Sequence, residues 1–259
     1  GEIVYSVTYG VLPSGWRVTP QHPEASTAVV VFGCSFAFGE GLEDEQSFPW
    51  QLAERLGPGY QVFNFGFPGY GAHHMLSWIE SGILDDIAAR YSKVHVFYST
   101  IRGHELRGLG YSQWDPYGPW YGFDKGRIVR KGVFADDISP LRPATDALFG
   151  KSLLYRKFLK TKLIPHFLRF KHHAAIIKEA DRQSRRIAGA PLTAVLWPRV
   201  LFAEAIREEG VDILDLSPLF PDWENGPDKY RLHPSDGHPN ALAASIVAKA
   251  LADYVRSNP

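Results

Sequence analysis

Two residues with nucleophilic side chains stand next to each other after a short apolar run. Residues 28–32 read AVVVF, and Gly33, Cys34 and Ser35 follow. A serine or a cysteine can attack a carbonyl when a base and an oriented carboxylate lie nearby. Cys34 is the only cysteine in the chain, and a lone cysteine most often behaves as a small buried hydrophobic residue. The two residues alone leave open which of them is the nucleophile.

A base and a carboxylate occur together near the end of the chain. The stretch HPSDGHPN, residues 233–240, contains Asp236 and His238 and comes just before an apolar run with helical spacing. An imidazole can take a proton from a hydroxyl nucleophile, and a neighbouring carboxylate can orient the ring. Either residue could instead simply cap the helix that follows.

Two further stretches could supply groups that bind a substrate or its oxyanion. NFGFPGYG begins at Asn64 and includes Gly69, and its glycines make backbone N–H groups accessible. STIRGHELR, residues 99–107, contributes Arg102 and His104. The sequence therefore holds the parts needed for acyl transfer, distributed over four short segments.

These segments stand at the borders of elements that alternate along the chain. Predicted strands cover residues 28–32, 60–66, 93–100, 192–198 and 211–217, and predicted helices cover residues 46–57, 72–91, 199–210 and 240–257. Short apolar strands separated by amphipathic helices are typical of a parallel sheet covered on both faces. Functional groups gather at the carboxyl ends of such strands, so we expect the four segments to meet there.

Two regions depart from this alternation. Residues 1–27 are expected to form an N-terminal hairpin extension, because IVYSVTY at 3–9 alternates as a strand does and WRVTP could pair with it. A large insertion is expected between about 105 and 175, first aromatic and then basic. The basic part of the insertion belongs to the segment 151–186, which contains eleven Lys and Arg residues and extends past the expected end of the insertion. We predict one domain over 1–259.

Three short motifs in this order resemble the SGNH (GDSL-like) hydrolase superfamily. That family opens with Gly-Asp-Ser after the first strand and a glycine soon after, and this chain has GCSFAFGEG. The family's second motif places a glycine five residues after an asparagine, which matches Asn64 and Gly69. Its last motif is an aspartate followed by His-Pro, which matches Asp236 and His238. The motifs span most of the chain but leave residues 105–230 largely unmatched.

The resemblance implies a fold and a set of roles. It implies a three-layer α/β/α sandwich with a central parallel sheet, flavodoxin-like in type. It makes Ser35 the nucleophile, His238 its general base and Asp236 the group that orients the imidazole. The backbone N–H groups of Ser35 and Gly69 would form the oxyanion hole. Cys34 then takes the place of the family's aspartate and is expected to be structural.

The chain departs from the family pattern in two further ways. Asp236 and His238 are two residues apart, where the family usually has three. Either Gly237 introduces a compensating kink, or another acid orients the histidine. The family's third motif supplies an asparagine to the oxyanion hole, and IRGHELR has none. His104 or Arg102 could donate in its place, or the hole could contain only the two backbone donors.

The leading functional prediction is a serine esterase that acts on acyl or acetyl esters, with acylated carbohydrate as the favoured substrate. Substrate contacts are expected from Asn64, Arg102, Trp114 and Trp120, the last two lying in the aromatic run WDPYGPWYGF. Asn64 could instead hold its own loop by side-chain hydrogen bonds, and the aromatic residues could instead pack the insertion onto the core. The same machinery would serve an O-acyltransferase if a sugar hydroxyl replaced water. A non-catalytic carbohydrate-binding protein with this fold is the third alternative.

No cofactor and no metal are expected. The histidines and acids near the predicted site do not follow a metal-binding spacing such as HExxH, and adjacent histidines on regular structure are expected to point in different directions. His73 and His74 begin a predicted helix and are expected on the surface. The expected partner is therefore only the small-molecule or carbohydrate ester.

The overall composition restricts the remaining partners. The formal net charge is zero and 45% of the residues are hydrophobic, which is typical of a globular protein and gives no indication of nucleic-acid binding. No run approaches the roughly 18 apolar residues of a membrane span, and no signal peptide is recognised. A membrane-surface role for 151–186 is an alternative that we do not favour. The compartment and the oligomeric state are left open.

Overall fold

A fully parallel sheet of five strands forms the centre of the protein. The computed structural model describes residues 3–112, 114–136, 166–223 and 226–258. The strands are β1 (Thr27–Gly33), β2 (Tyr60–Gly66), β3 (Lys93–Thr100), β6 (Leu192–Leu196) and β7 (Asp212–Asp215). Their order is β2-β1-β3-β6-β7, which is the flavodoxin-like order 2-1-3-4-5 when counted within the sheet.

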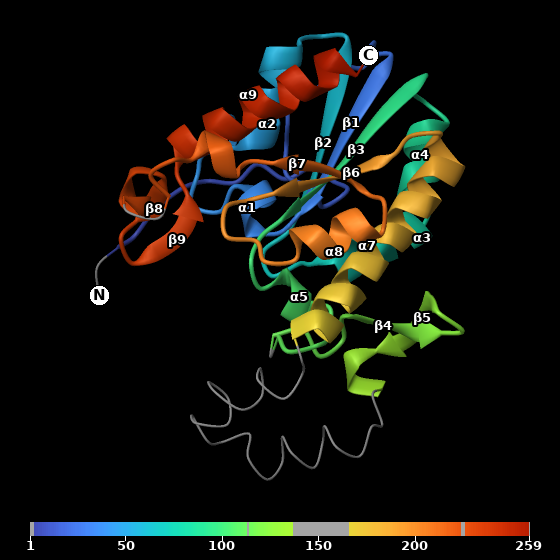
Figure 1. The fold of residues 1–259 in the computed structure, drawn as a ribbon. Coiled ribbons are helices and arrows are strands. Elements are labelled where there is room, and N and C mark those ends of the chain that lie inside the picture. The colour runs from blue at the N-terminus through green and yellow to red at the C-terminus, as the bar shows by residue number, and fades with distance from the viewer. Residues whose placement is uncertain (1–2, 113, 137–165, 224–225, 259) are drawn as a thin grey trace.

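Helices cover both faces of this sheet (Figure 1). One face is covered by α2 (Phe48–Leu56) and α9 (Ala241–Ser257). The other face is covered by α3 (Ala72–Glu80), α4 (Ile83–Ala88), α7 (His166–Ala188) and α8 (Ala203–Glu208). The predicted three-layer α/β/α sandwich is therefore confirmed.

The apolar run in β1 explains why the sheet needs both layers. Val30 and Phe32 pack into the core on the α3 side, whereas Val29 and Val31 pack on the α2 side. Successive side chains of a strand point to opposite faces, so a strand without polar residues must be covered twice. All four side chains are at most 1% exposed, and burying each one contributes about 1.5–3 kcal/mol of transfer free energy.

The long helix predicted over 72–91 is two helices. α3 ends before Gly82, and α4 begins after it. Gly82 has φ of 94°, a left-handed conformation that glycine adopts without steric cost, so the chain turns here instead of continuing the helix. Both helices still pack on the same face of the sheet.

The predicted insertion contains an antiparallel hairpin of β4 (Pro119–Asp124) and β5 (Arg127–Val133). In Figure 1 the hairpin lies at the lower right, to the right of α5 (His104–Arg107). Its predicted end near residue 175 falls inside α7, whose buried Ala174, Ile177 and Ala180 belong to the core.

The part of the basic segment that the structure describes is thus a helix of the sandwich, and residues 151–165 lie outside the described residues. Among the helices of the described residues, none has the length and apolar character to cross a membrane.

The strand predicted over 3–9 is not formed. These residues have no regular secondary structure, and the expected hairpin is reduced to one antiparallel bridge between Val11 and Arg17. The alternating side chains contact the loop after β1 instead of pairing with a partner strand: Tyr9 accepts a hydrogen bond from Gly41 N and packs edge-on against Phe38.

Arg17 is the anchor of this N-terminal segment. It is 1% exposed, and its guanidinium donates to the backbone carbonyls of Phe38, Gly39 and Leu42, each at 2.6 Å. Its Nε also donates to Asp44 at 3.0 Å. A guanidinium that satisfies three carbonyls and a carboxylate fixes the loop that follows the predicted nucleophile.

Candidate active site

Ser35 is placed by the turn between β1 and α1 (Ser35–Phe38). Gly33 ends the strand, and a Cβ atom there would lie 2.6 Å from Ala37 Cβ and 3.1 Å from Ser99 Cβ. Only glycine therefore allows the chain to turn so closely against β3. Ser35 is the first residue of the helix and is 5% exposed.

Asp236 and His238 lie on the antiparallel hairpin of β8 (Arg231–His233) and β9 (Asp236–Pro239), and Figure 1 shows β9 beside α1. Residues i and i+2 of a strand point to the same side. The spacing of two residues therefore brings the carboxylate and the imidazole together without a kink at Gly237. A spacing of three would place them on opposite sides of an extended strand.

Hydrogen bonds connect the three residues in a chain. His238 Nδ1 lies 2.6 Å from Asp236 Oδ1, and His238 Nε2 lies 2.9 Å from Ser35 Oγ. A carboxylate only accepts, so Nδ1 carries the proton and Nε2 is left to accept from the serine hydroxyl. The arrangement can therefore transfer a proton from Ser35 to His238.

Asp236 is held as a carboxylate. Burial is the largest single effect and raises the pKa of Asp236. His238 lowers that pKa through the hydrogen bonds from its backbone N–H and its ring, and through the charge of the ring. The net result is a pKa of Asp236 below its ordinary value. Its Oδ1 accepts both from His238 N, at 2.9 Å, and from the ring, so the ring orientation is fixed by two contacts.

Gly69 lies in the loop between β2 and α3. The register of β1 and β2 pairs Gly33 with Gly66, so this loop leaves the sheet next to the turn that carries Ser35. Gly69 has φ of 84°, which favours glycine. Its N–H donates no hydrogen bond within the described residues, and Ser35 N is at the first turn of a helix, where N–H groups have no intrahelical acceptor.

Asn64 does not face the site. It is 1% exposed, and its Oδ1 accepts from Gly66 N at 3.0 Å. This hydrogen bond agrees with the expectation that Asn64 holds its own loop, the one that carries Gly69, and nothing among the described contacts supports the substrate contact.

His104 is also buried rather than exposed to a substrate. It is 0% exposed, and its Nδ1 lies 2.7 Å from Tyr98 Oη and 3.1 Å from Thr100 Oγ1. These contacts place it in the core between β3 and α7, so its predicted role as an oxyanion donor is wrong. Arg102 is exposed, and among the described residues no contact joins it to Ser35 or His238.

Cys34 is the residue before helix α1 and is 0% exposed. A thiol without access to the surface cannot reach a substrate carbonyl. Of the two adjacent candidates, only Ser35 has a side chain that contacts the histidine.

The two tryptophans of the aromatic run lie in different places. Trp114 is 67% exposed, and its Nε1 would lie 2.5 Å from a Cβ atom at Gly69. Trp120 is half-buried in β4, a strand that is fastened to α3 by Tyr121 through its hydrogen bond to Glu80. Within the described residues, nothing brings Trp120 to the triad.

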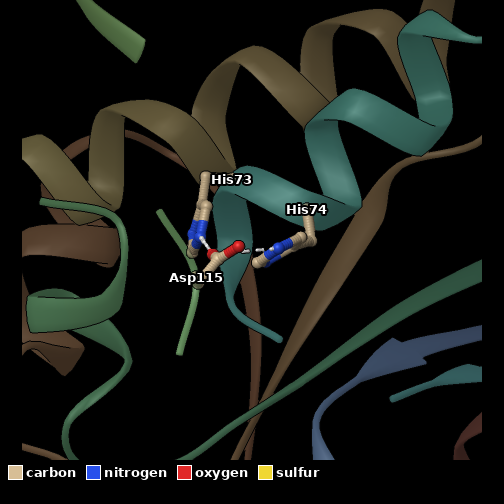
Figure 2. A group of neighbouring side chains, drawn as sticks. All are labelled: His73, His74 and Asp115. Carbon is tan, nitrogen blue, oxygen red and sulfur yellow. Dashed lines mark hydrogen bonds and ion pairs between the residues drawn. The ribbon is translucent and has the colours of Figure 1, made fainter. Parts of the chain in front are cut away.

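The structure corrects the surface placement of His73 and His74. They are 0% and 8% exposed, and both direct Nε2 at Asp115 Oδ2, at 3.4 and 3.2 Å (Figure 2). Burial lowers the pKa of His73 to about 3, against the opposing hydrogen bond to Asp115. Asp115 remains ionised because the two imidazoles outweigh burial and lower its pKa. No sequence pattern links these histidines to an aspartate more than forty positions away.

This cluster is the one place among the described residues where three ligand-type side chains converge closely enough for a metal ion. The expectation that adjacent histidines cannot point together is therefore wrong here. The hydrogen bonds of His74 argue against an ion, because His74 Nδ1 accepts from Gly71 N at 3.3 Å, whereas the buried Nδ1 of His73 has no hydrogen-bond partner among the described residues. The bond to His74 Nδ1 leaves the proton on Nε2, where a metal would need a free lone pair.

Glu40 is a site residue that the sequence analysis missed. Its Oε2 lies 3.6 Å from His238 Nε2, the nitrogen that contacts Ser35. Tyr5 from the N-terminal segment donates to Glu40 at 3.2 Å. Burial and the charge of Glu40 raise the pKa of Tyr5 to about 12, so the phenol stays protonated. The position of Glu40, five residues after the serine, could have suggested a contact, whereas nothing in the sequence connects Tyr5 to the site.

Comparisons with known proteins were made for sequence and for structure. No family model matches the chain, and no curated protein matches it in sequence. Similar solved structures include a protein described as a GDSL-like lipase from Parabacteroides merdae (11% identity, 88% of this chain and 95% of that chain, TM-score 0.49). They also include Est24, a carbohydrate acetylesterase from Sinorhizobium meliloti (11%, 90% and 100%, 0.47), and an aryl esterase from M. smegmatis (13%, 90% and 99%, 0.44).

All three names are those of lipases or esterases, the enzyme class that the sequence motifs imply. At identities of 11 to 13% and TM-scores below 0.5 the likeness carries no argument about activity.

Proposed function

We propose that this chain is an SGNH-type ester hydrolase in which Ser35 is the nucleophile, His238 the general base and Asp236 the residue that orients the imidazole. The observation that supports this most directly is the hydrogen-bonded chain from Asp236 Oδ1 through His238 to Ser35 Oγ, at 2.6 and 2.9 Å. These distances lie within the reach that proton transfer between nucleophile and base requires.

The reaction then follows from the positions of these atoms. Ser35 Oγ attacks the ester carbonyl carbon while His238 Nε2 takes its proton, and the carbonyl electron pair moves to oxygen. The N–H groups of Ser35 and Gly69 stabilise that oxyanion. When the carbonyl re-forms, the C–O bond to the alcohol breaks and His238 returns the proton to the leaving oxygen. Water repeats the sequence on the acyl-enzyme, which releases the acid and restores the serine hydroxyl.

Two carboxylates support the charged intermediate of this cycle. Asp236 contacts Nδ1 of His238, and Glu40 lies 3.6 Å from Nε2. Both stabilise the imidazolium that forms when the base holds the proton. They also place negative charge next to the nucleophile, which favours neutral or cationic esters over anionic ones.

The substrate class that we propose is acylated carbohydrate. Trp114 is 67% exposed beside Gly69, and Tyr117, three residues further on, is 79% exposed. Exposed aromatic rings offer flat faces on which a sugar ring can rest, and their burial by a ligand would be favourable.

O-acyl transfer is a second candidate because of the groups around His238. The carboxylate of Glu40 and the hydroxyl of Tyr5 lie on the side of Nε2 where water or an acceptor must be deprotonated. They could hold a sugar hydroxyl in that position. A Glu40→Gln variant should then lower acetyl transfer to an added oligosaccharide more than it lowers hydrolysis. Equal effects on both reactions would argue for hydrolysis alone.

The first experiment measures turnover of p-nitrophenyl acetate. Ser35→Ala should lower kcat by about 10⁴-fold or more, as removal of a triad member does in other serine hydrolases. Ser235→Ala is the matched control, because this exposed serine lies on the β8–β9 turn and contacts only His233 among the described residues. Cys34→Ala should keep the activity.

Labelling identifies the nucleophile directly. A fluorophosphonate should modify Ser35, as shown by mass mapping of the labelled peptide, and the label should be absent from Ser35→Ala. Labelling at another residue, or turnover that persists in Ser35→Ala, would reject the proposed role. Sugar binding without turnover of any acyl donor would point to a binding protein instead.

A further inference from the structure

The predicted oxyanion hole lacks a third donor. Two N–H groups are available from Ser35 and Gly69, and the residues expected to replace the missing asparagine do not reach it. His104 is 0% exposed in the core, and Arg102 has no contact with the triad within the described residues. A further donor would have to lie close enough to Gly69 to share one oxygen with its N–H.

Trp114 lies beside Gly69. Its indole Nε1 would be 2.5 Å from a Cβ atom placed on Gly69 and is the nearest atom to that Cβ position. With ordinary bond lengths, this puts Nε1 within about 4 Å of Gly69 Cα and within about 5 Å of Gly69 N. Two donors that share one oxygen at about 2.9 Å each are separated by up to about 5 Å. The distance between the two nitrogens therefore allows the indole and the glycine N–H to share one oxygen.

The indole N–H is free to donate. No hydrogen bond joins Trp114 Nε1 to any group among the described residues, and the side chain is 67% exposed. The indole N–H is a donor only, so it can serve an anion but not a cation. Gly69, with φ of 84°, is the residue type that lets the ring come so close, because any side chain there would collide with it.

The residue after Trp114 explains how the indole is held. Asp115 is bound by His73 and His74, which stand in the first turn of α3, a few residues after Gly69 (Figure 2). The ring of Tyr70 stacks on His74 with centroids 3.9 Å apart and planes 7° apart. The same short segment therefore carries the glycine and fastens the loop that carries the tryptophan.

We propose that the indole N–H of Trp114 is the third donor of the oxyanion hole, in place of the missing asparagine, and that Asp115 is a positioning residue that holds it there. This inference rests on the proposed function, because it needs an oxyanion formed on Ser35. It assigns a catalytic atom to a residue whose exposed ring would otherwise be only a platform for substrate.

The test is Trp114→Phe, which keeps an aromatic ring and removes the N–H. With p-nitrophenyl acetate we expect kcat to fall by about 10²-fold and KM to change by less than about threefold, because the lost contact is made mainly in the transition state. Trp50→Phe is the matched control: it removes an indole N–H that donates to Glu54 on helix α2, and it should leave kcat unchanged. An unchanged kcat in Trp114→Phe, or a rise in KM alone, would overturn the inference.

A transition-state mimic provides a second measurement. A trifluoromethyl ketone adds to Ser35 and forms an oxyanion, so its affinity should fall in Trp114→Phe by about the same factor as kcat/KM. A reduced kcat with unchanged inhibitor affinity would overturn the inference.

The positioning role of Asp115 is tested separately. Asp115→Ala should lower kcat with little change in KM, and Asp115→Asn, which keeps an oxygen that accepts from both imidazoles, should recover much of the loss. Equal losses in both variants would reject it. The proposed function fails on a different result, namely turnover that survives in Ser35→Ala.

Discussion

Lowering the pH from 7 to 5 should destabilise this protein through histidines that its core keeps uncharged. His73 and His173 are both 0% exposed. Burial is the main cause that lowers the pKa of each to about 3, and neighbouring histidines add to it. An unfolded histidine titrates near pH 6.5. Between these two values the unfolded state binds more protons than the folded state.

The sign and the size of the effect follow from this difference. The stability that comes from keeping each ring neutral is fully present above about pH 6.5 and is lost as the pH falls towards 3, by about 1.4 kcal/mol per pH unit and histidine. From pH 7 to pH 5 the loss amounts to about 2 kcal/mol for each residue and about 4 kcal/mol for the two. That is a large part of the 5–15 kcal/mol by which proteins are usually stable. Carboxylates with lowered pKa values begin to contribute only below about pH 4.

The measurement is urea unfolding followed by circular dichroism at pH 7, 6 and 5. His173 packs edge-on against Phe202 with ring centroids 4.5 Å apart, so His173→Phe keeps an aromatic contact and removes one proton site. Its unfolding free energy should fall less steeply between pH 7 and pH 5, by about 1 kcal/mol per pH unit on average. His22→Gln, at a half-buried position near the N-terminus, is the control and should keep the steeper slope. A wild-type stability that does not change between pH 7 and 5 would refute the reasoning.

Three further predictions concern the site and its support. Asp236→Asn should lower kcat by about 10³–10⁴-fold with a small change in KM, because an amide can leave the wrong histidine nitrogen protonated; steady-state kinetics would contradict this if kcat stayed within tenfold. Thiol reagents should not inactivate the folded enzyme, since Cys34 is 0% exposed, and rapid inactivation that is absent in Cys34→Ala would show that the thiol is reached. Arg17→Met should reduce the unfolding free energy by about 3 kcal/mol or more, because it leaves buried carbonyls unpaired; an unchanged urea midpoint would show that water replaces the guanidinium.

The sheet and the residues at its edge could be predicted because their signals are local. An all-apolar strand must be covered on both faces, and Ser35, Gly69 and Asp236 each follow or precede a recognisable element. The spacing of two residues between Asp236 and His238 is explained by the extended conformation of β9, which places both side chains on the same side of the strand. The sequence showed both residues but not the backbone conformation between them.

Burial of the histidines could not be predicted, because it depends on residues distant in the chain. His73 and His74 both contact Asp115, which follows β3 in the sequence, whereas the two histidines precede that strand. His104 follows a strand as the other site residues do, yet its contacts with Tyr98 and Thr100 turn it into the core. A position at the end of a strand indicates where a residue lies and not which way its side chain points.

The anchoring of Arg17 sets a limit on how this protein can be shortened. A chain that began at Thr27 would keep all five strands of the sheet and the helices on both faces. It would lose the Arg17 guanidinium, which donates hydrogen bonds to the carbonyls of Phe38, Gly39 and Leu42. It would also lose the hydrogen bond from the Tyr5 hydroxyl to Glu40. Such a fragment should keep its secondary structure, as measured by circular dichroism, and lose most of the proposed esterase activity. We therefore expect the shortest chain that folds to be shorter than the shortest chain that carries the proposed activity.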